Sequence, residues 1–327
     1  MSDLESPPRL TPEQIQGLDL SDLAPGEDIV ASDDEVIYED GFFTSYDGTK
    51  LFWQSWSGAS EPRRGRIALM HGYGEHSSRY AHVGHALVRA GYDVMAFDAR
   101  GHGRSDGKDA HVYMYDEYVL DLERLCGVLE ERWGEDRGPL FVLGHSNGGL
   151  IALRYALRRP KHVMGFMISS PMCGFKVKVP VWKEKVGGVM SKVWPTFGLP
   201  TELDPKHLTH LESVVKKYAD DPLVKTIATA RWFDEAKSAQ ADLKARAAKI
   251  DHPLLMLVGG SDEIVDPQAA QDIYYRLGSK SKEIEVYRPL FHEILNEESW
   301  DEITRRMITW LEQQREALGV VGAGEQE

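Results

Sequence analysis

One serine in this sequence stands where it could act as a nucleophile. A short apolar run at 140–143 leads directly into a Gly-x-Ser-x-Gly motif centred on Ser146, and apolar residues then recur at helical spacing from Leu150 onward. A serine in a sharp strand–turn–helix connection adopts a positive φ and needs small neighbours. Gly144 and Gly148 are those small neighbours. The pattern therefore predicts that Ser146 is a catalytic nucleophile at the start of a helix.

Two later residues could provide the base and the acid that a nucleophilic serine needs. A serine hydroxyl reacts when a base within hydrogen-bond reach takes its proton, and a carboxylate orients that base. Asp262 follows a buried apolar run at 254–258, and His292 follows the next predicted strand at 284–287. In a strand–helix–strand fold with this elbow, the partners follow the serine in the order acid, then histidine. We predict Asp262 as the orienting acid and His292 as the base.

Other residues compete for the role of the acid. Glu263 and Asp266 lie close to Asp262 in the sequence and are rival candidates. Asp262 itself could have a purely structural role in a turn. Asp98 is a more distant alternative, although the Arg-Gly-His-Gly that follows it is typical of a structural turn. Most of the 12 histidines are expected to be structural or solvated, and only His292 follows the last predicted strand in a loop.

An oxyanion hole needs two backbone N–H donors aimed at the developing negative charge. One predicted donor is the N–H of Asn147, the residue after the nucleophile, at a helix N-terminus. The second is the N–H of Tyr73, in a glycine-containing loop at 71–74 that follows the predicted strand 66–70. The alternative is that this loop is only a flexible connection.

The elements that would position these residues alternate between strands and helices. An Asp-Gly turn at 47–48 joins two strands and predicts an antiparallel hairpin at the edge of a sheet. After it the alternation predicts an α/β fold with a mostly parallel, doubly wound sheet, in which ligands bind at the carboxyl ends of the strands. Residues 171–235 interrupt the alternation with helices and loops, and a helix from 236 to 248 is expected to return to the core.

These changes divide the chain into four parts. We expect an acidic, poorly ordered leader at 1–35, a core at 36–170 and 236–316, a helical cap at 171–235 and a frayed tail at 317–327. Within the leader, Thr-Pro-Glu-Gln at 11–14 is typical of a capped helix start.

Charge and composition exclude several classes of protein. The 327 residues carry a net charge of −14, and twelve of the 52 acidic residues lie within 1–40, beside one base, Arg9. The remaining chain is nearly neutral, which argues against a nucleic-acid partner. No apolar run is long enough to span a membrane, and the N-terminus lacks the features of a secretory signal. Two cysteines, Cys126 and Cys173, form no disulfide framework or metal cluster, so we expect cytosolic thiols and a cytoplasmic protein. The serine chemistry described above implies no metal or organic cofactor.

The predicted cap contains an amphipathic basic stretch. Residues 176–194 hold five lysines and one glutamate, and Pro180 begins a helix with one apolar face. One interpretation is a lid whose apolar face covers the active site. The other is a lid that docks transiently on lipid aggregates, with these residues at the surface: Trp182, Lys183, Lys185 and Trp194.

Several motifs together are far more specific than any one of them. They are His-Gly-x-Gly-Glu-His-Ser-x-Arg-Tyr at 71–80, Asp-x-Arg-Gly-His-Gly-x-Ser at 98–105, Gly-His-Ser-x-Gly-Gly at 144–149, Gly-Ser-Asp at 260–262 and the His292 loop. With them, about residues 36–315 resemble the monoacylglycerol lipase and bacterial lysophospholipase branch of the α/β-hydrolases. The resemblance implies an α/β-hydrolase fold with a cap over the acyl site. It also implies a Ser146–Asp262–His292 triad and oxyanion donors at Tyr73 and Asn147.

The sequence departs from the family pattern at one site residue. The family usually has methionine after the serine, where this chain has Asn147. The backbone N–H survives this change, but a polar side chain there is expected to alter the pocket.

The expected function is hydrolysis of carboxylic esters with a medium or long acyl chain, such as monoacylglycerols or lysophospholipids. Three alternatives remain: a short-chain carboxylesterase, an acyltransferase on the same triad, and a binding protein that kept the fold without turnover. A dehalogenase is excluded because its nucleophile would be a carboxylate.

Overall fold

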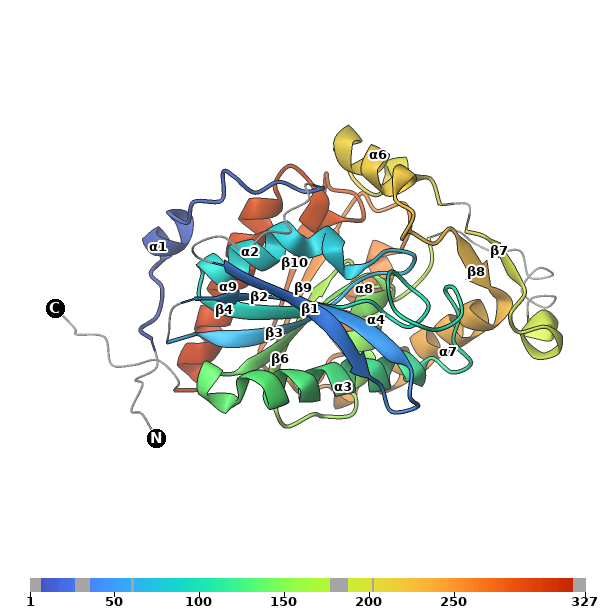
Figure 1. Ribbon diagram of the computed structural model, residues 1–327, viewed down its shortest axis with the longest axis horizontal. Helices are drawn as coiled ribbons and strands as arrows, with labels where there is room; N and C mark the ends of the chain where they lie inside the picture. Colours follow the sequence, from blue (N-terminus) through green and yellow to red (C-terminus); the bar gives the residue numbers. More distant parts are fainter. Residues whose placement is uncertain (1–6, 27–35, 60–61, 177–187, 202, 320–327) are drawn as a thin grey trace.

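A computed structural model describes residues 7–26, 36–59, 62–176, 188–201 and 203–319 of the chain. In this part an eight-stranded sheet has the order β1-β2-β4-β3-β5-β6-β9-β10 and lies between two layers of helices (Figure 1). Its strands are β1 (Val36–Thr44), β2 (Lys50–Gly58), β3 (Gly65–Met70), β4 (Tyr92–Phe97), β5 (Leu140–His145), β6 (Val163–Ser169), β9 (Leu254–Gly259) and β10 (Lys282–Tyr287). From β4 to β10 every neighbouring pair is parallel, so the predicted mostly parallel sheet is confirmed.

The first two strands form the predicted hairpin at one edge of the sheet. β1 pairs antiparallel with β2, with Val36 opposite Gly58 and Thr44 opposite Lys50. β2 then pairs antiparallel with β4, which joins the hairpin to the parallel strands. The hairpin therefore lies far from the central strands that carry the candidate site.

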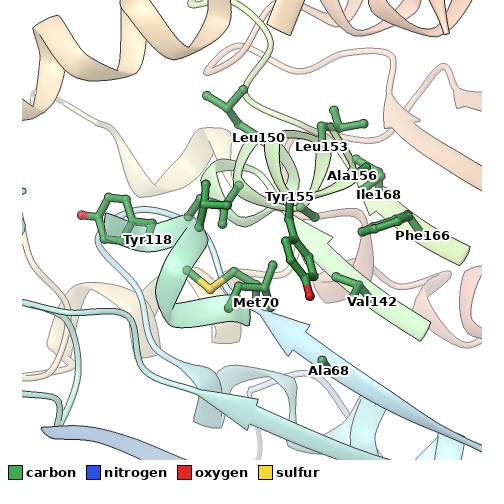
Figure 2. Packing of buried hydrophobic residues seen from close by; sticks show 14 of the residues in the cluster. Ala68, Met70, Tyr118, Val142, Leu150, Leu153, Tyr155, Ala156, Phe166 and Ile168 are labelled. Atoms are coloured by element: carbon green, nitrogen blue, oxygen red, sulfur yellow. The ribbon is translucent and has the colours of Figure 1, made fainter. Parts of the chain in front are cut away.

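Helices cover both faces of the sheet. α2 (Ala81–Arg89) and α9 (Trp300–Ala317) pack on one face. The other face is covered by α3 (Asp116–Trp133), α4 (Asn147–Ala156), α7 (Ala230–Arg246) and α8 (Pro267–Arg276). Figure 2 shows Leu150, Leu153 and Ala156 of α4 packed with buried side chains of the sheet. This packing fixes α4, and with it Ser146 directly before its first residue.

An insertion between β6 and β9 lies at one end of the sheet (Figure 1). It contains α6 (Glu212–Asp220) and a two-stranded antiparallel sheet of β7 (Gly198–Pro200) and β8 (Ile227–Thr229). The sequence does not predict this pair, because strands of three residues are too short to show an alternating pattern. The returning helix α7 begins six residues before the expected 236, so it crosses the predicted boundary between cap and core. Trp182, Lys183 and Lys185 of the predicted lid lie outside the described residues.

The described part of the leader, residues 7–26, differs from the expectation of a poorly ordered segment. Residues 7–26 lie along α2 and α9 and include the predicted capped helix, α1 (Pro12–Gln16). Three apolar side chains bury against these helices: Ile15, Leu20 and Leu23. The carboxylate of Asp22 also accepts two hydrogen bonds of 2.6 Å from Arg89. The acidic composition did not predict this packing, because charged residues separate the few apolar residues that become buried.

None of the helices that the structure describes has the length and apolar content required to span a membrane. The C-terminal helix α9 ends at Ala317, and residues 320–327 of the predicted tail lie outside the described part of the chain.

Candidate active site

Ser146 lies at the junction of β5 and α4 with a strained backbone. Its φ is 53° and its ψ is −115°, a backbone conformation that residues other than glycine rarely adopt. A methyl group added at Gly148 would lie 2.2 Å from the Met70 carbonyl oxygen, and one at Gly144 would lie 2.4 Å from that of Gly148. The two glycines of the motif thus allow β3, β5 and α4 to pack closely enough to force the sharp turn.

The structure brings the three predicted triad residues together. His292 Nε2 lies 2.8 Å from Ser146 Oγ, and His292 Nδ1 lies 2.6 Å from Asp262 Oδ2. Asp262 follows β9, and His292 lies in the loop after β10. Because both strands run parallel to β5, their following loops meet Ser146 at the same edge of the sheet.

The surroundings of Asp262 and His292 favour opposite charges on the two side chains. Burial alone would raise the pKa of Asp262, but His292 and hydrogen bonds from the N–H groups of Ile264 and Val265 hold that pKa below its usual value. Burial would lower the pKa of His292, yet attraction to and the hydrogen bond with Asp262 raise it. An ionised Asp262 accepts a hydrogen bond from His292 Nδ1–H, which leaves Nε2 unprotonated and able to take a proton from the serine.

The two predicted oxyanion residues lie on either side of the nucleophile. Asn147 is the first residue of α4, where backbone N–H groups have no partner within the helix. Tyr73 belongs to the loop after β3, and a methyl group at the adjacent Gly72 would lie 3.1 Å from Ser146 Cβ. The Tyr73 ring stacks on Trp232 with centroids 3.7 Å apart. Its loop is therefore fixed beside the serine by side-chain contacts rather than freely connected.

The competing acids occupy structural positions. Asp98 accepts hydrogen bonds of 2.8 Å from the N–H groups of Ser77 and Arg104, and so stabilises a buried turn. Asp266 accepts a bond of 3.0 Å from Gln268 N–H and caps α8. Glu263 lies at the cavity wall and makes no hydrogen bond to His292 in the described part of the structure. Only Asp262 has a carboxylate oxygen at hydrogen-bond distance from His292 in this part of the chain.

A cavity of about 510 Å³ opens over Ser146 and His292. Core and insertion both contribute to its walls, which hold many apolar and aromatic side chains: Met172, Phe175, Leu203, Leu208, Tyr218, Ala228, Trp232, Phe233, Ile264 and Val265. Asn147 is not among the wall residues, because its side chain turns toward Tyr115. The Asn147 side chain is therefore not in direct contact with the cavity, and its expected effect on the pocket stays a prediction.

A buried ionic network beneath the site was not anticipated from the sequence. Glu75 accepts hydrogen bonds of 2.6 Å from Gly72 N–H and from the Arg79 guanidinium, which also binds Glu293 through two bonds. Burial alone would raise the pKa of Glu75, but Arg79 and neighbouring histidines lower it to about 2. The network joins the Tyr73 loop to the residue after His292. The four-residue spacing of Glu75 and Arg79 was a signal for their pairing, whereas nothing in the sequence predicted Glu293 as the partner.

Known proteins resemble this chain over most of its length. A family model described as serine aminopeptidase, S33, matches residues 61–299. A monoacylglycerol lipase of Mycolicibacterium smegmatis is 31% identical over 271 residues, which cover 82% of this chain and 95% of that protein. The human monoglyceride lipase is 27% identical over 320 residues, covering 96% of this chain and 97% of that one.

Solved structures agree with these matches. The crystal structure of a monoacylglycerol lipase from Paleococcus ferrophilus is 32% identical and has a TM-score of 0.68, covering 86% of this chain and 99% of that one. The α/β-hydrolase fold that the resemblance implied, with its mostly parallel sheet, is confirmed by this similarity and by the observed strand order.

Proposed function

The chain belongs to the family described as serine aminopeptidase, S33, and we propose that it is a serine hydrolase of carboxylic esters with medium or long acyl chains. The observation that carries the proposal is the hydrogen-bonded series Ser146–His292–Asp262 at the base of a largely apolar cavity. Monoacylglycerols and lysophospholipids are the substrate classes we propose, because relatives across nearly the whole chain are named monoacylglycerol or monoglyceride lipase.

In the proposed first step, Ser146 Oγ attacks the ester carbonyl while His292 Nε2 takes its proton. Asp262 holds the imidazole and stabilises the positive charge that forms on it. The carbonyl oxygen becomes an oxyanion, for which we propose the N–H groups of Tyr73 and Asn147 as donors. His292 then protonates the departing alcohol, and the acyl group remains on the serine.

In the second step water replaces the alcohol. His292 takes a proton from the water while the water oxygen attacks the acyl-enzyme carbonyl. The attack forms a second tetrahedral intermediate, which again carries an oxyanion. Collapse of this intermediate breaks the bond to Ser146 Oγ, which recovers its proton from His292 as the fatty acid leaves. Every proton transfer in this scheme uses one histidine with a raised pKa.

The size and apolar walls of the cavity favour binding of an acyl chain over binding of a small polar acid. Each methylene that leaves water for an apolar wall contributes roughly 0.8 kcal/mol. A cavity of about 510 Å³ can accommodate several methylenes beside the reacting carbonyl. We therefore expect catalytic efficiency to rise with chain length until the cavity is full.

The test is hydrolysis of p-nitrophenyl esters from acetyl to palmitoyl, together with a monoacylglycerol and a lysophospholipid, with Ser146→Ala as the control. An aminoacyl p-nitroanilide is included because the family description names an aminopeptidase. We expect an optimum at medium or long chains that disappears in Ser146→Ala. An optimum at acetyl or butyryl would move the substrate to short-chain esters, and turnover of the anilide alone would replace the proposal.

Two alternatives on the same fold have direct tests. Product analysis with glycerol as acceptor separates an acyltransferase, which forms a new ester, from a hydrolase, which releases fatty acid. A binding protein without turnover would give no product from any ester, while retaining acyl ligands.

The proposed location is the cytoplasm, where the free thiols of Cys126 and Cys173 are stable.

The insertion also supports transient contact with a lipid surface. Residues 188–193 are helical, and their region exposes apolar side chains, with Val193 77% and Trp194 57% accessible. Exposed aromatic and aliphatic groups beside lysine are typical of interfacial helices. We expect sedimentation with anionic vesicles, reduced in the Val193→Ser and Trp194→Ala variants. Equal sedimentation of these variants, or none of the wild type, would leave the apolar face only as a cover for the cavity.

A further inference from the structure

The loop before α3 contacts both proposed oxyanion residues, although no motif marks it. The Tyr115 hydroxyl donates a hydrogen bond of 2.6 Å to Asn147 Oδ1. Both side chains are buried, at 2% and 1% exposure. Five residues earlier, the Ala110 carbonyl oxygen accepts a bond of 2.9 Å from the Tyr73 hydroxyl.

The same loop is itself held by the insertion and the start of α7. His111 Nδ1 lies 2.8 Å from Thr229 Oγ1. Arg231 Nε donates to the Tyr113 carbonyl oxygen at 2.8 Å, and the Tyr115 N–H donates to Glu235 Oε2 at 2.9 Å. Residues 110–115 are therefore fixed on one side by the insertion and contact the two donor residues on the other.

We propose that Tyr115 is a positioning residue for the oxyanion hole, acting through the side chain of Asn147. The inference rests on the proposed function, because it assumes that the Asn147 N–H binds the oxyanion. Tyr115 does not touch the reacting atoms. Its hydroxyl anchors the side chain of Asn147, and this fixes the direction of the N–H on the same residue.

The chemistry of the pair explains why an asparagine can stand after the nucleophile. A buried amide oxygen without a donor is costly, and the tyrosine hydroxyl supplies that donor. Burial raises the pKa of Tyr115 well above its usual value, so the hydroxyl keeps its proton throughout the working range of a histidine base. Methionine at this position would need no such partner. Tyr115 and Asn147 are thus expected to act as a matched pair.

Small errors in donor position have large effects on rate. Loss of one oxyanion donor lowers kcat by about 100- to 1,000-fold, and misplacement of a reacting group by about 1 Å can cost roughly 100-fold. A donor that is retained but less well fixed should cost less. We expect Tyr115→Phe and Asn147→Met each to lower kcat about 10-fold with KM nearly unchanged.

The experiment is a double-mutant cycle on the hydrolysis of a p-nitrophenyl ester. Tyr115→Phe leaves the amide oxygen without its donor. Asn147→Met removes the acceptor at 2.6 Å and leaves the hydroxyl only the longer contact of 3.4 Å with the backbone carbonyl oxygen of residue 147. The double variant removes both polar groups, and the space of the lost hydroxyl helps to accommodate methionine. We expect kcat of the double variant to return to within about 3-fold of the wild type, because no unpaired polar group remains.

A matched control separates positioning from general stability. Tyr155 is a buried tyrosine on α4 whose hydroxyl lies 3.0 Å from His162 Nε2, away from the cavity. Tyr155→Phe should lower the thermal midpoint about as much as Tyr115→Phe and leave kcat unchanged. The pH midpoint for activity should be the same in all variants, because the partners of His292 are untouched.

The inference is overturned if Tyr115→Phe keeps the full kcat, or if the two single losses multiply in the double variant. These outcomes differ from failure of the proposed function, in which Ser146→Ala would retain turnover. Recovery in the double variant with unchanged KM supports the matched pair.

Discussion

The elbow and the insertion differ in how tightly the chain is held. At the elbow, a strained serine is enclosed by close backbone contacts: a methyl group at Gly148 would lie 2.2 Å from a carbonyl oxygen. In the insertion, no atom of the described residues lies within 4 Å of such a methyl group at Gly188, and nearby Val193 is 77% exposed. At the elbow, where we place the chemistry, the packing leaves no space for an added methyl group. At Gly188 in the insertion, which we expect to help bind the substrate, the described residues leave that space.

This difference separates reaction from substrate choice. Proton transfer depends on the distances of 2.6 and 2.8 Å within the proposed triad, which a closely packed sheet edge can maintain. Oxyanion binding likewise needs donors in fixed positions. Selection of an acyl chain depends on the apolar area of the cavity walls and needs less exact geometry. We expect changes at the elbow to affect kcat for every ester, and changes in the insertion to affect long-chain substrates most.

The largest expected effect comes from Asp262→Asn, which keeps the size of the side chain and removes its charge. An amide in place of the carboxylate favours the wrong histidine tautomer, so kcat should fall about 10⁴-fold, as in a serine protease triad. Steady-state ester hydrolysis measures it. Asp266→Asn is the matched control, because Asp266 caps α8 and should leave kcat unchanged. Equal activity of Asp262→Asn and the wild type would remove Asp262 from the proposed triad.

The next effect tests the comparison itself through two glycine substitutions. Gly148→Ala should lower the free energy of unfolding by about 3 kcal/mol, because overpacking against backbone cannot be relieved by rotation of a side chain. Gly188→Ala should change it by less than about 0.5 kcal/mol or stabilise the protein slightly. Urea denaturation of both variants measures the difference. Similar destabilisation by the two substitutions would contradict the contrast between the regions.

A smaller and graded effect is expected from pH. The proposed base works only when His292 is neutral, and Asp262 raises the pKa of His292 above its ordinary value of 6.5. Protonation therefore begins at a higher pH than for a free imidazole, and kcat/KM should fall about tenfold per unit below that pKa. A pH–rate profile should give a midpoint above 6.5. A midpoint below this value would mean that burial outweighs the attraction to Asp262.

The sequence predicted the site better than its surroundings because each feature leaves a different signal. Ser146 and Asp262 follow apolar runs and His292 follows the next predicted strand, so the motifs and the predicted parallel topology placed all three at one edge of the sheet. The docking of Ile15 and the two short strands of the insertion were missed, because three or four residues show no periodicity. The pairing of Tyr115 with Asn147 joins residues 32 positions apart. No local pattern predicts such a contact, and only the packed structure shows it.

The most direct test of the central claim is labelling with a fluorophosphonate followed by mass spectrometry of the tryptic peptides. Such a reagent reacts with a serine hydroxyl that a neighbouring base activates. The account predicts one adduct on Ser146, formed together with complete loss of ester hydrolysis. Labelling should be absent in Ser146→Ala and strongly slowed in Asp262→Asn. An intact Ser146 in an inactivated enzyme, or an adduct on another residue, would contradict the account.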